Sequence, residues 1–481
     1  MSNEKKRKFS LGTYGILIII LIAVAVITNF ASGQPYVNSE GVEGVVEGAS
    51  FSQTLLAPIR GFHDAGEVIG FIFCLGAFLS LVTATGALET GINVLVKKMH
   101  GKELMLIPVL MFLFSIGGST YGMGEETVGF YILLAATMTA AGMDPVVGAA
   151  TVLLGAGSGV IGSTINPFAT GAAVANAGVD LSMAVVYAEG LILWIVVYLM
   201  STVFVLNYAK KVKNGGGSIL TDEQLAECIS AYGKSAEIKE NPMLTGKQKI
   251  CMWIFALTFV VMILGFIPWG SLNEDIYNFF SWSKFLTGSG FGDWWFDDAA
   301  MWFLIMGLII GVIGMEDRSK IASTVMSGIS DMVSVNVVIA LARATSVIMA
   351  QTGFGNWLVQ VSVTALTNTG ISAGVFGFLD YLLHIGLSFL VPSSSGLAAL
   401  SSPIVSPIVS TIGWSAETSV MINVAANGLV NLFTPTCGFI MGGLALARVP
   451  YEVWIRWSWK LILAIGVVSV VILTGAMIIF S

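Results

Sequence analysis

The chain has 481 residues, of which 56% are hydrophobic and only 11% are charged, and its mean hydropathy is +0.86. Because a water-soluble domain carries about 25% charged residues, this composition excludes a soluble globular protein and indicates an integral membrane protein. The formal charge is −7, and the basic residues form no stripe interleaved with aromatic residues, which excludes a nucleic-acid partner.

Nine apolar stretches are long enough to cross a bilayer as helices. In chain order they are residues 11–30, 63–86, 146–178, 182–208, 249–268, 299–315, 330–352, 418–446 and 459–480. The first stretch follows the basic run 5–8 (KKRK) and is longer than the apolar part of a signal peptide. We therefore expect it to remain as the first membrane helix of an all-α polytopic protein.

Charged residues between these stretches indicate the side on which each loop lies. Basic residues gather at 5–8, 97–102, 210–213, 234–249 and 448–460, whereas acidic residues dominate 40–47 and 274–298. Lysine and arginine resist translocation, so we expect the N-terminus and the basic loops to be cytoplasmic, in a bacterial cytoplasmic membrane. Two further apolar stretches, about 103–141 and about 372–412, must then begin and end on one side each. They are predicted to be re-entrant hairpins that enter from opposite faces.

An internal repeat relates the two halves of the chain. Residues 61–86 align without gaps on residues 328–353, and the alignment pairs Gly61 with Gly328, Asp64 with Asp331, Ala77 with Ala344 and Thr85-Gly86 with Thr352-Gly353. The extra span 249–268 lies between the halves, so the second copy enters the bilayer from the opposite face. Inverted repeats of this kind are typical of secondary transporters.

The repeat suggests a division of the chain into three parts. Residues 1–208 form the first inverted repeat with hairpin 1, and residues 299–481 form the second with hairpin 2. Between them, residues 209–298 supply a cytoplasmic linker, the connecting span and an external loop.

Each half interrupts its apolar sequence twice in the same order. The hairpin centres are residues 117–122 (GGSTYG) and 392–396 (PSSSG), and polar breaks with proline follow at 163–167 (STINP) and 431–436 (NLFTPT). Non-helical backbone is tolerated in hydrocarbon only where protein or water replaces lipid. We therefore expect a substrate site where the two tips converge, whereas residues 155–159 (GAGSG) are interpreted as a close helix-packing surface.

Three ionisable residues at membrane depth are candidates for this site. Glu125 and Glu126 follow the first tip, and a charge there costs on the order of 3 kcal/mol, which calls for a partner or a wet cavity. Alternatively, these acids stabilise the dipole of a helix at 125–140. Arg343 lies near the middle of the span 330–352, where it binds a substrate carboxylate or serves as an internal counter-ion.

Other charged residues are given structural roles. Asp64 and Asp331 are expected to cap the N-termini of their helices. Asp380 and His384 lie one turn apart, and we expect them to tie the second hairpin to its neighbours rather than to relay a proton.

The segments 117–127 (GGSTYGMGEET), 162–168 (GSTINPF) and 431–436 (NLFTPT) resemble the YfcC family, which belongs to the C4-dicarboxylate anaerobic carriers and is similar to arginine/ornithine antiporters. The resemblance covers nearly the whole chain and implies the ion-transporter superfamily fold, usually a homodimer with a scaffold part and a mobile part that works as an elevator. Sodium-coupled members hold substrate and Na⁺ at Ser-Asn-Thr signatures. Here the tips read Gly-Ser-Thr and Pro-Ser-Ser-Ser, so the coupling ion stays open between Na⁺ and H⁺.

We expect a secondary active transporter of a small polar metabolite, a basic amino acid exchanged in the manner of arginine for ornithine. Glu125 and Glu126 would meet the cationic end and Arg343 or a helix N-terminus the carboxylate, while hydroxyl and amide groups fix the orientation. The expected substrate-binding residues are Ser119, Thr120, Tyr121, Glu125, Glu126, Asn166, Arg343, Ser393, Ser394, Ser395, Asn431 and Thr434.

Three alternatives remain beside this expectation. The first keeps the fold and carries a C4-dicarboxylate, with Arg343 as the anchor and sodium or protons as the driver. The second is an intramembrane serine hydrolase that uses Ser158 with His384, and the third is a channel. Walker A, HExxH and GxGxxG motifs are missing and the cysteines and histidines are scattered, so no catalytic residue, cofactor or metal site is predicted.

Overall fold

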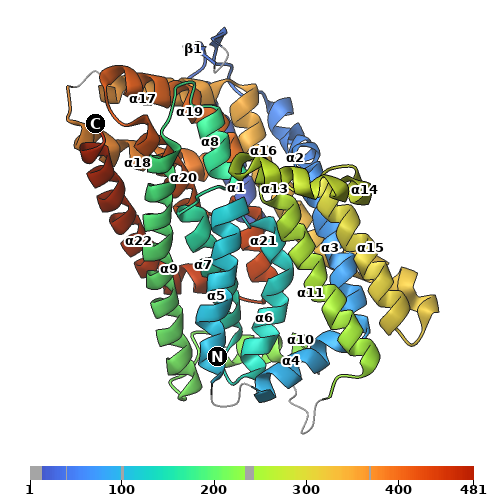
Figure 1. Ribbon diagram of the computed structural model, residues 1–481. Coiled ribbons are helices and arrows are strands. Elements are labelled where there is room, and N and C mark those ends of the chain that lie inside the picture. The colour runs from blue at the N-terminus through green and yellow to red at the C-terminus, as the bar shows by residue number, and fades with distance from the viewer. Residues whose placement is uncertain (1–12, 39–40, 99–101, 233–242, 368–369) are drawn as a thin grey trace, which may run out of the picture.

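The computed structural model describes residues 13–38, 41–98, 102–232, 243–367 and 370–481. These residues form a helical bundle with one small sheet (Figure 1). The helices of the first half are α1 (Thr13–Phe30), α2 (Phe51–Asp64), α3 (Gly66–Ala84), α4 (Ala87–Lys98), α5 (Leu106–Tyr121), α6 (Val128–Ala140), α7 (Pro145–Ile161), α8 (Ala172–Ala175) and α9 (Met183–Lys213). Short 3₁₀ turns at Glu103–Met105 and Glu125–Thr127 and a π turn at Pro167–Gly171 lie between them.

The middle of the chain and the second half are also helical. The middle contains α10 (Asp222–Tyr232), α11 (Gly246–Phe266), α12 (Trp269–Leu272), α13 (Glu274–Phe279), α14 (Lys284–Thr287) and α15 (Phe296–Gly314), with 3₁₀ turns at Phe280–Ser283 and Arg318–Lys320. The second half contains α16 (Ile321–Gln351), α17 (Phe354–Thr367), α18 (Ala373–Leu390), α19 (Ser394–Ile412), α20 (Ala416–Val430), α21 (Gly438–Leu446) and α22 (Tyr451–Ile479). The sheet pairs β1 (Pro35–Val37) with β2 (Glu43–Val45) in antiparallel register, Tyr36 opposite Gly44.

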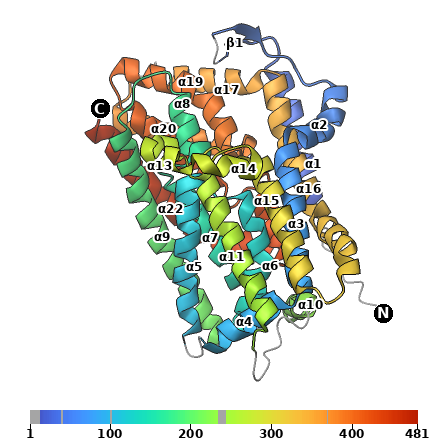
Figure 2. The same cartoon turned by 45° about the vertical axis from the view of Figure 1, so that its right-hand side comes forward.

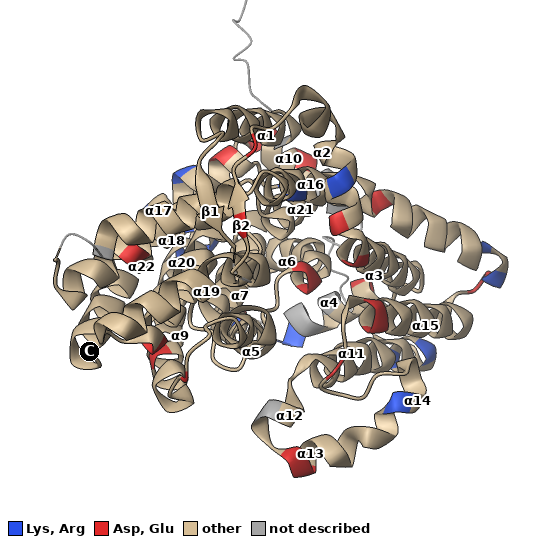
Figure 3. Cartoon of the chain, turned by 90° about the horizontal axis from the view of Figure 1, so that it is seen from above, with Lys and Arg blue, Asp and Glu red and all other residues tan. Residues whose placement is uncertain are grey.

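The prediction of an all-α membrane protein is confirmed. Each of the nine predicted spans contains a helix, and nine helices in the described part of the chain are long and apolar enough to cross a membrane. The two sets of nine differ, because the arms at 103–121, 373–390 and 394–412 meet the length criterion, whereas α1 and α7 are shorter and the span 418–446 is split into α20 and α21. Viewed along the bundle in Figure 3, most of the ribbon carries no charged residue.

The two repeat copies cross each other as antiparallel helices. A Cβ atom on Gly61 would collide with the Ala340 carbonyl oxygen, and one on Gly76 would collide with that of Gly328. The alignment pairs Gly61 with Gly328, and each of these glycines packs closely on the backbone of the other copy, Gly61 at Ala340 and Ala344 and Gly328 at Gly76. Gly86 and Gly353, which are also paired, both adopt left-handed φ values of +66° and +69° after a helix. The backbone thus repeats with inverted direction.

Both predicted hairpins are pairs of helices with a reversal inside the protein. Figures 1 and 2 show α5 and α6 in the half of the molecule that contains α4 and α10, and α17 and α19 at the opposite end, near β1. α5 and α6 both pack on α7, and α18 and α19 both pack on α20, so the two halves repeat one arrangement.

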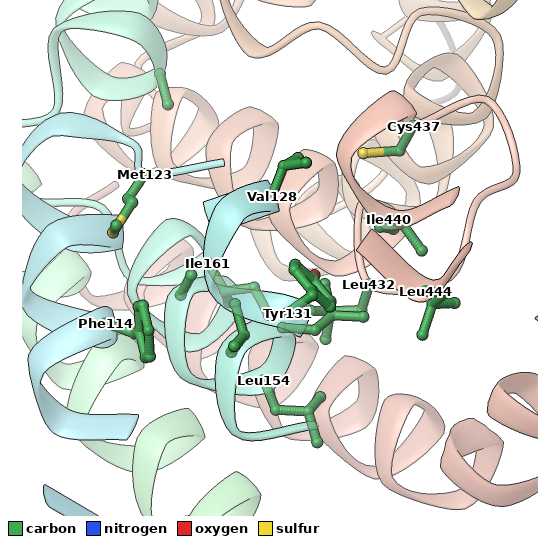
Figure 4. Close-up of a cluster of buried hydrophobic side chains, with 14 of the residues drawn as sticks. Phe114, Met123, Val128, Tyr131, Leu154, Ile161, Leu432, Cys437, Ile440 and Leu444 are labelled. Carbon is green, nitrogen blue, oxygen red and sulfur yellow. The ribbon is translucent and has the colours of Figure 1, made fainter. Parts of the chain in front are cut away.

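The broken helices α7 and α20 form the centre of the bundle. Every residue of α7 is buried, and every residue of α20 except Glu417 is buried. A Cβ atom on Gly428 would lie 2.8 Å from the Ile161 Cα atom, which shows that the ends of the two helices touch. Figure 4 shows apolar side chains of both halves gathered beside this contact, among them Tyr131 and Leu432.

Small residues on α7 make close packing possible, as predicted for residues 155–159. A Cβ atom on Gly159 would collide with the Ser115 carbonyl oxygen of α5, and one on Gly155 would lie 3.0 Å from the Met111 Cα atom. The Ser158 hydroxyl donates to the Gly155 carbonyl at 2.7 Å within the same helix. These residues therefore bring backbones together, as small residues do in membrane helices.

The predicted capping role of Asp64 and Asp331 is wrong. Asp64 is the last residue of α2, and α3 begins after Ala65 without a side-chain cap. Asp331 lies inside α16, which begins at Ile321 because Asp317 already caps the 3₁₀ turn before it. Neither aspartate therefore caps the N-terminus of a helix.

Candidate functional site

A cavity of about 240 Å³ lies between the tips of the two hairpins. Its lining comes from the α5–α6 reversal, the start of α19, the chain around the α20–α21 break, α16, and the junction of α2 and α3. Aromatic side chains from the start of α15 and from the π turn after α7 also contribute. Both repeats therefore supply one tip and one break to the same space.

The first tip is a glycine-capped helix end followed by two acids. α5 ends at Tyr121 and is capped by Gly122, which has a left-handed φ of +77° and whose amide donates to the Gly118 carbonyl at 3.2 Å. Glu125 and Glu126 follow in a 3₁₀ turn, and the Glu126 carboxylate accepts the Gly124 amide at 3.0 Å. Glu126 is only 3% exposed, so its carboxyl group is held inside the protein at the cavity wall.

The second tip is a helix N-terminus held by two asparagines. Ser393 precedes α19, and its hydroxyl accepts the Gly396 amide at 3.3 Å. Asn427 and Asn431 on α20 both donate to the Pro392 carbonyl, at 3.2 and 3.0 Å. The Asn431 side-chain oxygen is buried without a hydrogen-bond partner among the described residues, and Asn431 lines the cavity. That oxygen is available to a donor on a bound solute.

The cavity carries more negative than positive groups. Its lining contains four carboxyl side chains and one guanidinium, namely Asp64, Glu67, Glu125, Glu126 and Arg343. Arg343 Nη1 lies 3.7 Å from Asp64 Oδ2, and the Glu67 carboxylate accepts the indole N–H of Trp295. With Arg343 beside Asp64, no second cation faces the two glutamates of the first tip from the described lining.

Seven of the twelve residues predicted from the sequence line this cavity. They are Glu125, Glu126, Arg343, Ser393, Ser394, Ser395 and Asn431. The other five support the tips from behind. Ser119 donates to the Gly162 carbonyl at 2.9 Å, Thr120 to the Ile116 carbonyl at 2.7 Å, and Tyr121 stacks on Phe266 with centroids 5.8 Å apart. Asn166 accepts the amides of Phe168 and Ala169, and Thr434 lies 2.7 Å from the Thr436 hydroxyl.

Sequence reasoning missed several lining residues. Asp64 was interpreted as a cap and Glu67 was not singled out, although two acids one turn apart inside the span 63–86 are a signal of the kind that marked Glu125. Trp295 and Phe296 follow a polar loop, and no pattern in the sequence connects them to the hairpin tips.

Asp380 and His384 belong to a buried network away from the cavity lining. His384 Nδ1 lies 3.0 Å from Asp380 Oδ1, and Nε2 lies 3.2 Å from the Ser401 hydroxyl. Ser419 donates to Asp380 at 2.9 Å and Asn423 donates to Ser401 at 2.6 Å. These bonds join α18, α19 and α20, which confirms the predicted tie. The ring nitrogens of His384 contact Asp380 and Ser401 rather than Ser158, so the Ser158–His384 pair of the hydrolase alternative is not formed.

The sequence matches the DcuC family, described as C4-dicarboxylate anaerobic carrier, over residues 11–478. It is 28% identical over 421 residues to an uncharacterized protein of Haemophilus influenzae, covering 86% of this chain and 76% of that protein. It is 25% identical over 426 residues to an Escherichia coli protein named "Putative basic amino acid antiporter YfcC", covering 86% of this chain and 78% of that protein.

Two solved transporter structures are also similar. The YdaH transporter of Alcanivorax borkumensis has a TM-score of 0.48 and 14% identity, with 95% of this chain and 98% of that chain covered. MtrF of Neisseria gonorrhoeae has a TM-score of 0.42 and 13% identity, with 98% and 96% covered.

Proposed function

The chain belongs to the DcuC family of carriers and is a secondary transporter rather than an enzyme, and we propose that it carries a basic amino acid by alternating access. The exchange of arginine for ornithine is the form of this activity that we propose. The name of the Escherichia coli relative, which is 25% identical, supports the same class of substrate.

The observation that carries the proposal is the excess of carboxyl groups in the cavity. Glu125 and Glu126 line it, Glu126 is nearly fully buried, and Arg343 lies beside Asp64. Carboxylates at membrane depth are retained where a counter-charge or water compensates them. The guanidinium of arginine or the side-chain ammonium of ornithine would supply that counter-charge when the substrate is bound.

The second tip supports a partner for the other end of an amino acid. The N-terminus of α19 carries partial positive charge, and Ser394 and Ser395 line the cavity there. A substrate carboxylate would bind these groups, with Arg343 as a further partner. The volume of about 240 Å³ lies below the roughly 300–1,000 Å³ of sites for drug-sized ligands, which favours a single small metabolite.

A C4-dicarboxylate is the second candidate, favoured by two observations. The family is described by that substrate, and Arg343 with the N-terminus of α19 offers two places for a carboxylate. Succinate would nevertheless bring two more negative charges to a wall that already holds four carboxyl groups. Competition separates the candidates, because succinate should not reduce arginine uptake if the basic amino acid is the substrate.

Counterflow in proteoliposomes tests the proposal. Vesicles loaded with ornithine should accumulate labelled arginine with saturable kinetics, and Glu125→Gln with Glu126→Gln should lower kcat/KM at least ten-fold. Glu452→Gln is the matched control, because Glu452 is an exposed acid in the first turn of α22. Unchanged arginine uptake by the double variant would disprove the cationic substrate.

The proposal extends to orientation and assembly. Basic loops support a cytoplasmic N-terminus in the bacterial cytoplasmic membrane. We propose two inverted repeats, 1–208 and 299–481, joined by 209–298, in a homodimer whose hairpins move against a fixed scaffold. Counterflow with and without Na⁺, and with and without a pH gradient, distinguishes sodium coupling, proton coupling and strict exchange.

A further inference from the structure

An apolar groove runs along the outside of the bundle between α18 and α22. Its volume is about 490 Å³, and its floor includes Leu429 of α20 and Phe433 from the break after α20. Side chains on its walls are exposed, among them Leu382 at 46%, Leu463 at 60% and Val471 at 66%. This groove lies away from the cavity between the hairpin tips, since the two share no lining residue.

Two basic side chains continue the groove along the same face of α22. Positions 456, 460, 463, 467 and 471 are three or four residues apart, so Arg456 and Lys460 lie on the helix face that carries Leu463 and Val471. Both are exposed, and within the described residues neither forms an ion pair. Lys460 Nζ lies 5.7 Å from the ring centroid of its neighbour Trp459. The groove therefore has an apolar body and a cationic end.

The cationic end lies near the basic end of α9. Trp457 packs against Phe204 and Tyr208, with ring centroids 4.6 and 5.0 Å apart. Tyr208 lies two residues before Lys210, and Lys210 and Lys211 belong to the last turn of α9. Basic residues and tryptophan at this level are typical of the zone where lipid head groups meet the hydrocarbon core.

We propose that this groove binds an anionic phospholipid, with its acyl chain between α18 and α22 and its phosphate at Arg456 and Lys460. Basic pockets between membrane helices bind anionic head groups, and the exposed apolar walls match a hydrocarbon chain. A second copy of the chain is the other possible occupant, and it would have to place carboxylates opposite the two exposed cations and an apolar surface against the groove. An anionic phospholipid carries a negative head group and an apolar chain in one molecule, so the charge pattern favours the lipid.

Native mass spectrometry of the purified full-length protein tests the site. With phosphatidylglycerol added, the wild type should retain bound lipid, and phosphatidylcholine should be retained far less. Arg456→Gln with Lys460→Gln should weaken phosphatidylglycerol binding about thirty-fold, because each basic contact near a membrane surface contributes about a factor of five. Lys247→Gln with Lys249→Gln, two exposed cations at the start of α11, is the matched control and should bind as the wild type does.

A second variant separates loss of the lipid from loss of folding. Val467→Trp fills the groove without changing charge and should also reduce retention, while the unfolding temperature in detergent without lipid stays within a few degrees of wild type. Equal retention of phosphatidylglycerol by the wild type and both groove variants would overturn the proposal. So would a change in the monomer–dimer ratio without a change in lipid retention, which would identify the groove as an interface between copies.

Discussion

Arg343 and Asp64 form an ion pair between the two repeat copies, with 3.7 Å between Nη1 and Oδ2. The alignment pairs Asp64 with Asp331 and Arg343 with Gly76, so the inverted counterpart of this pair has no cation on α3. Asp331 and Gly76 instead line a second cavity of about 880 Å³, to which Lys320 and Arg448 contribute. The two copies therefore share the helix crossing but differ in charge, because only the second copy carries an arginine at this position.

This pair should matter more for substrate binding than for stability. Both side chains are partly exposed, and pairs of this kind contribute about 0–1 kcal/mol to stability. Arg343→Gln should therefore move the unfolding temperature little, while KM for arginine rises about ten-fold or more if the guanidinium binds the substrate carboxylate. Asp64→Asn is the control for losing the pair alone. Equal effects of the two variants on KM would exclude a direct role for Arg343.

Asp64 and Asp331 should be reachable from opposite faces of the membrane. Both are exposed, and they occupy paired positions of an inverted repeat. Asp64→Cys and Asp331→Cys, each placed in a variant whose four native cysteines are replaced, should react with an impermeant thiol reagent from opposite sides of oriented vesicles. Labelling of both from one side would contradict the inverted arrangement.

The amide groups of Asn427 and Asn431 should stabilise the second tip. Both donate to the Pro392 carbonyl, and removing a partner from a buried polar group costs about 1–3 kcal/mol. Asn431→Leu should lower the unfolding free energy in this range and increase hydrogen exchange over residues 391–396. Asn176→Leu, which changes an asparagine bonded only within its own turn, is the control. Exchange at the second tip that stays at the wild-type level would show that other contacts hold it.

The buried network around His384 should act on stability rather than on proton coupling. Asp380→Asn leaves the shape and weakens the bonds to His384 and Ser419, so we expect a loss of about 1–3 kcal/mol in unfolding free energy. Arginine exchange per folded molecule should be retained across pH 6–8. A variant that is as stable as wild type but no longer responds to a pH gradient would instead identify a proton relay.

Glycine at the crossing of α3 and α16 should be irreplaceable. A Cβ atom on Gly76 would meet the Gly328 carbonyl oxygen, whereas one on Gly70 in the same helix would meet no atom within 4 Å. Gly76→Ala should reduce the yield of folded protein or lower its unfolding temperature by several degrees, and Gly70→Ala should be neutral or slightly stabilising. Equal behaviour of the two variants would mean that the helices separate easily.

The sequence indicated most of the membrane helices, and seven of the twelve site residues predicted from it line the cavity. Long apolar runs located the helices because hydropathy is a local feature, and several aligned pairs, Gly86 with Gly353 among them, indicated the repeat. Glu125 could be predicted because an ionisable residue within an apolar segment is rare. Ser119 and Thr120 were misplaced because α5 continues as a helix to Tyr121, so their hydroxyls bond to carbonyls behind the tip. Hydropathy shows neither the residue at which a helix ends nor the groups that a side chain contacts.

The short elements outside the apolar spans were harder to foresee. α2 was not predicted as a separate helix, because its polar and apolar residues mix in one amphipathic segment that joins α3 through Ala65. The two strands have three residues each and contain Gly44 and Glu43, which strand propensity disfavours. Their pairing depends on the chain turning back at Gly41 rather than on any periodic pattern.

Backbone-to-backbone packing also limits how this molecule can move. The peptide groups of α3 and α16 interlock at Gly76 and Gly328, and those of α5 and α7 do so at Ser115 and Gly159. Sliding either pair by half a helical turn, about 2.7 Å, would drive Cβ atoms into carbonyl oxygens. Each pair must therefore move as one rigid unit. Any displacement that carries a solute across the bilayer has to occur at the less tightly packed contacts between such units.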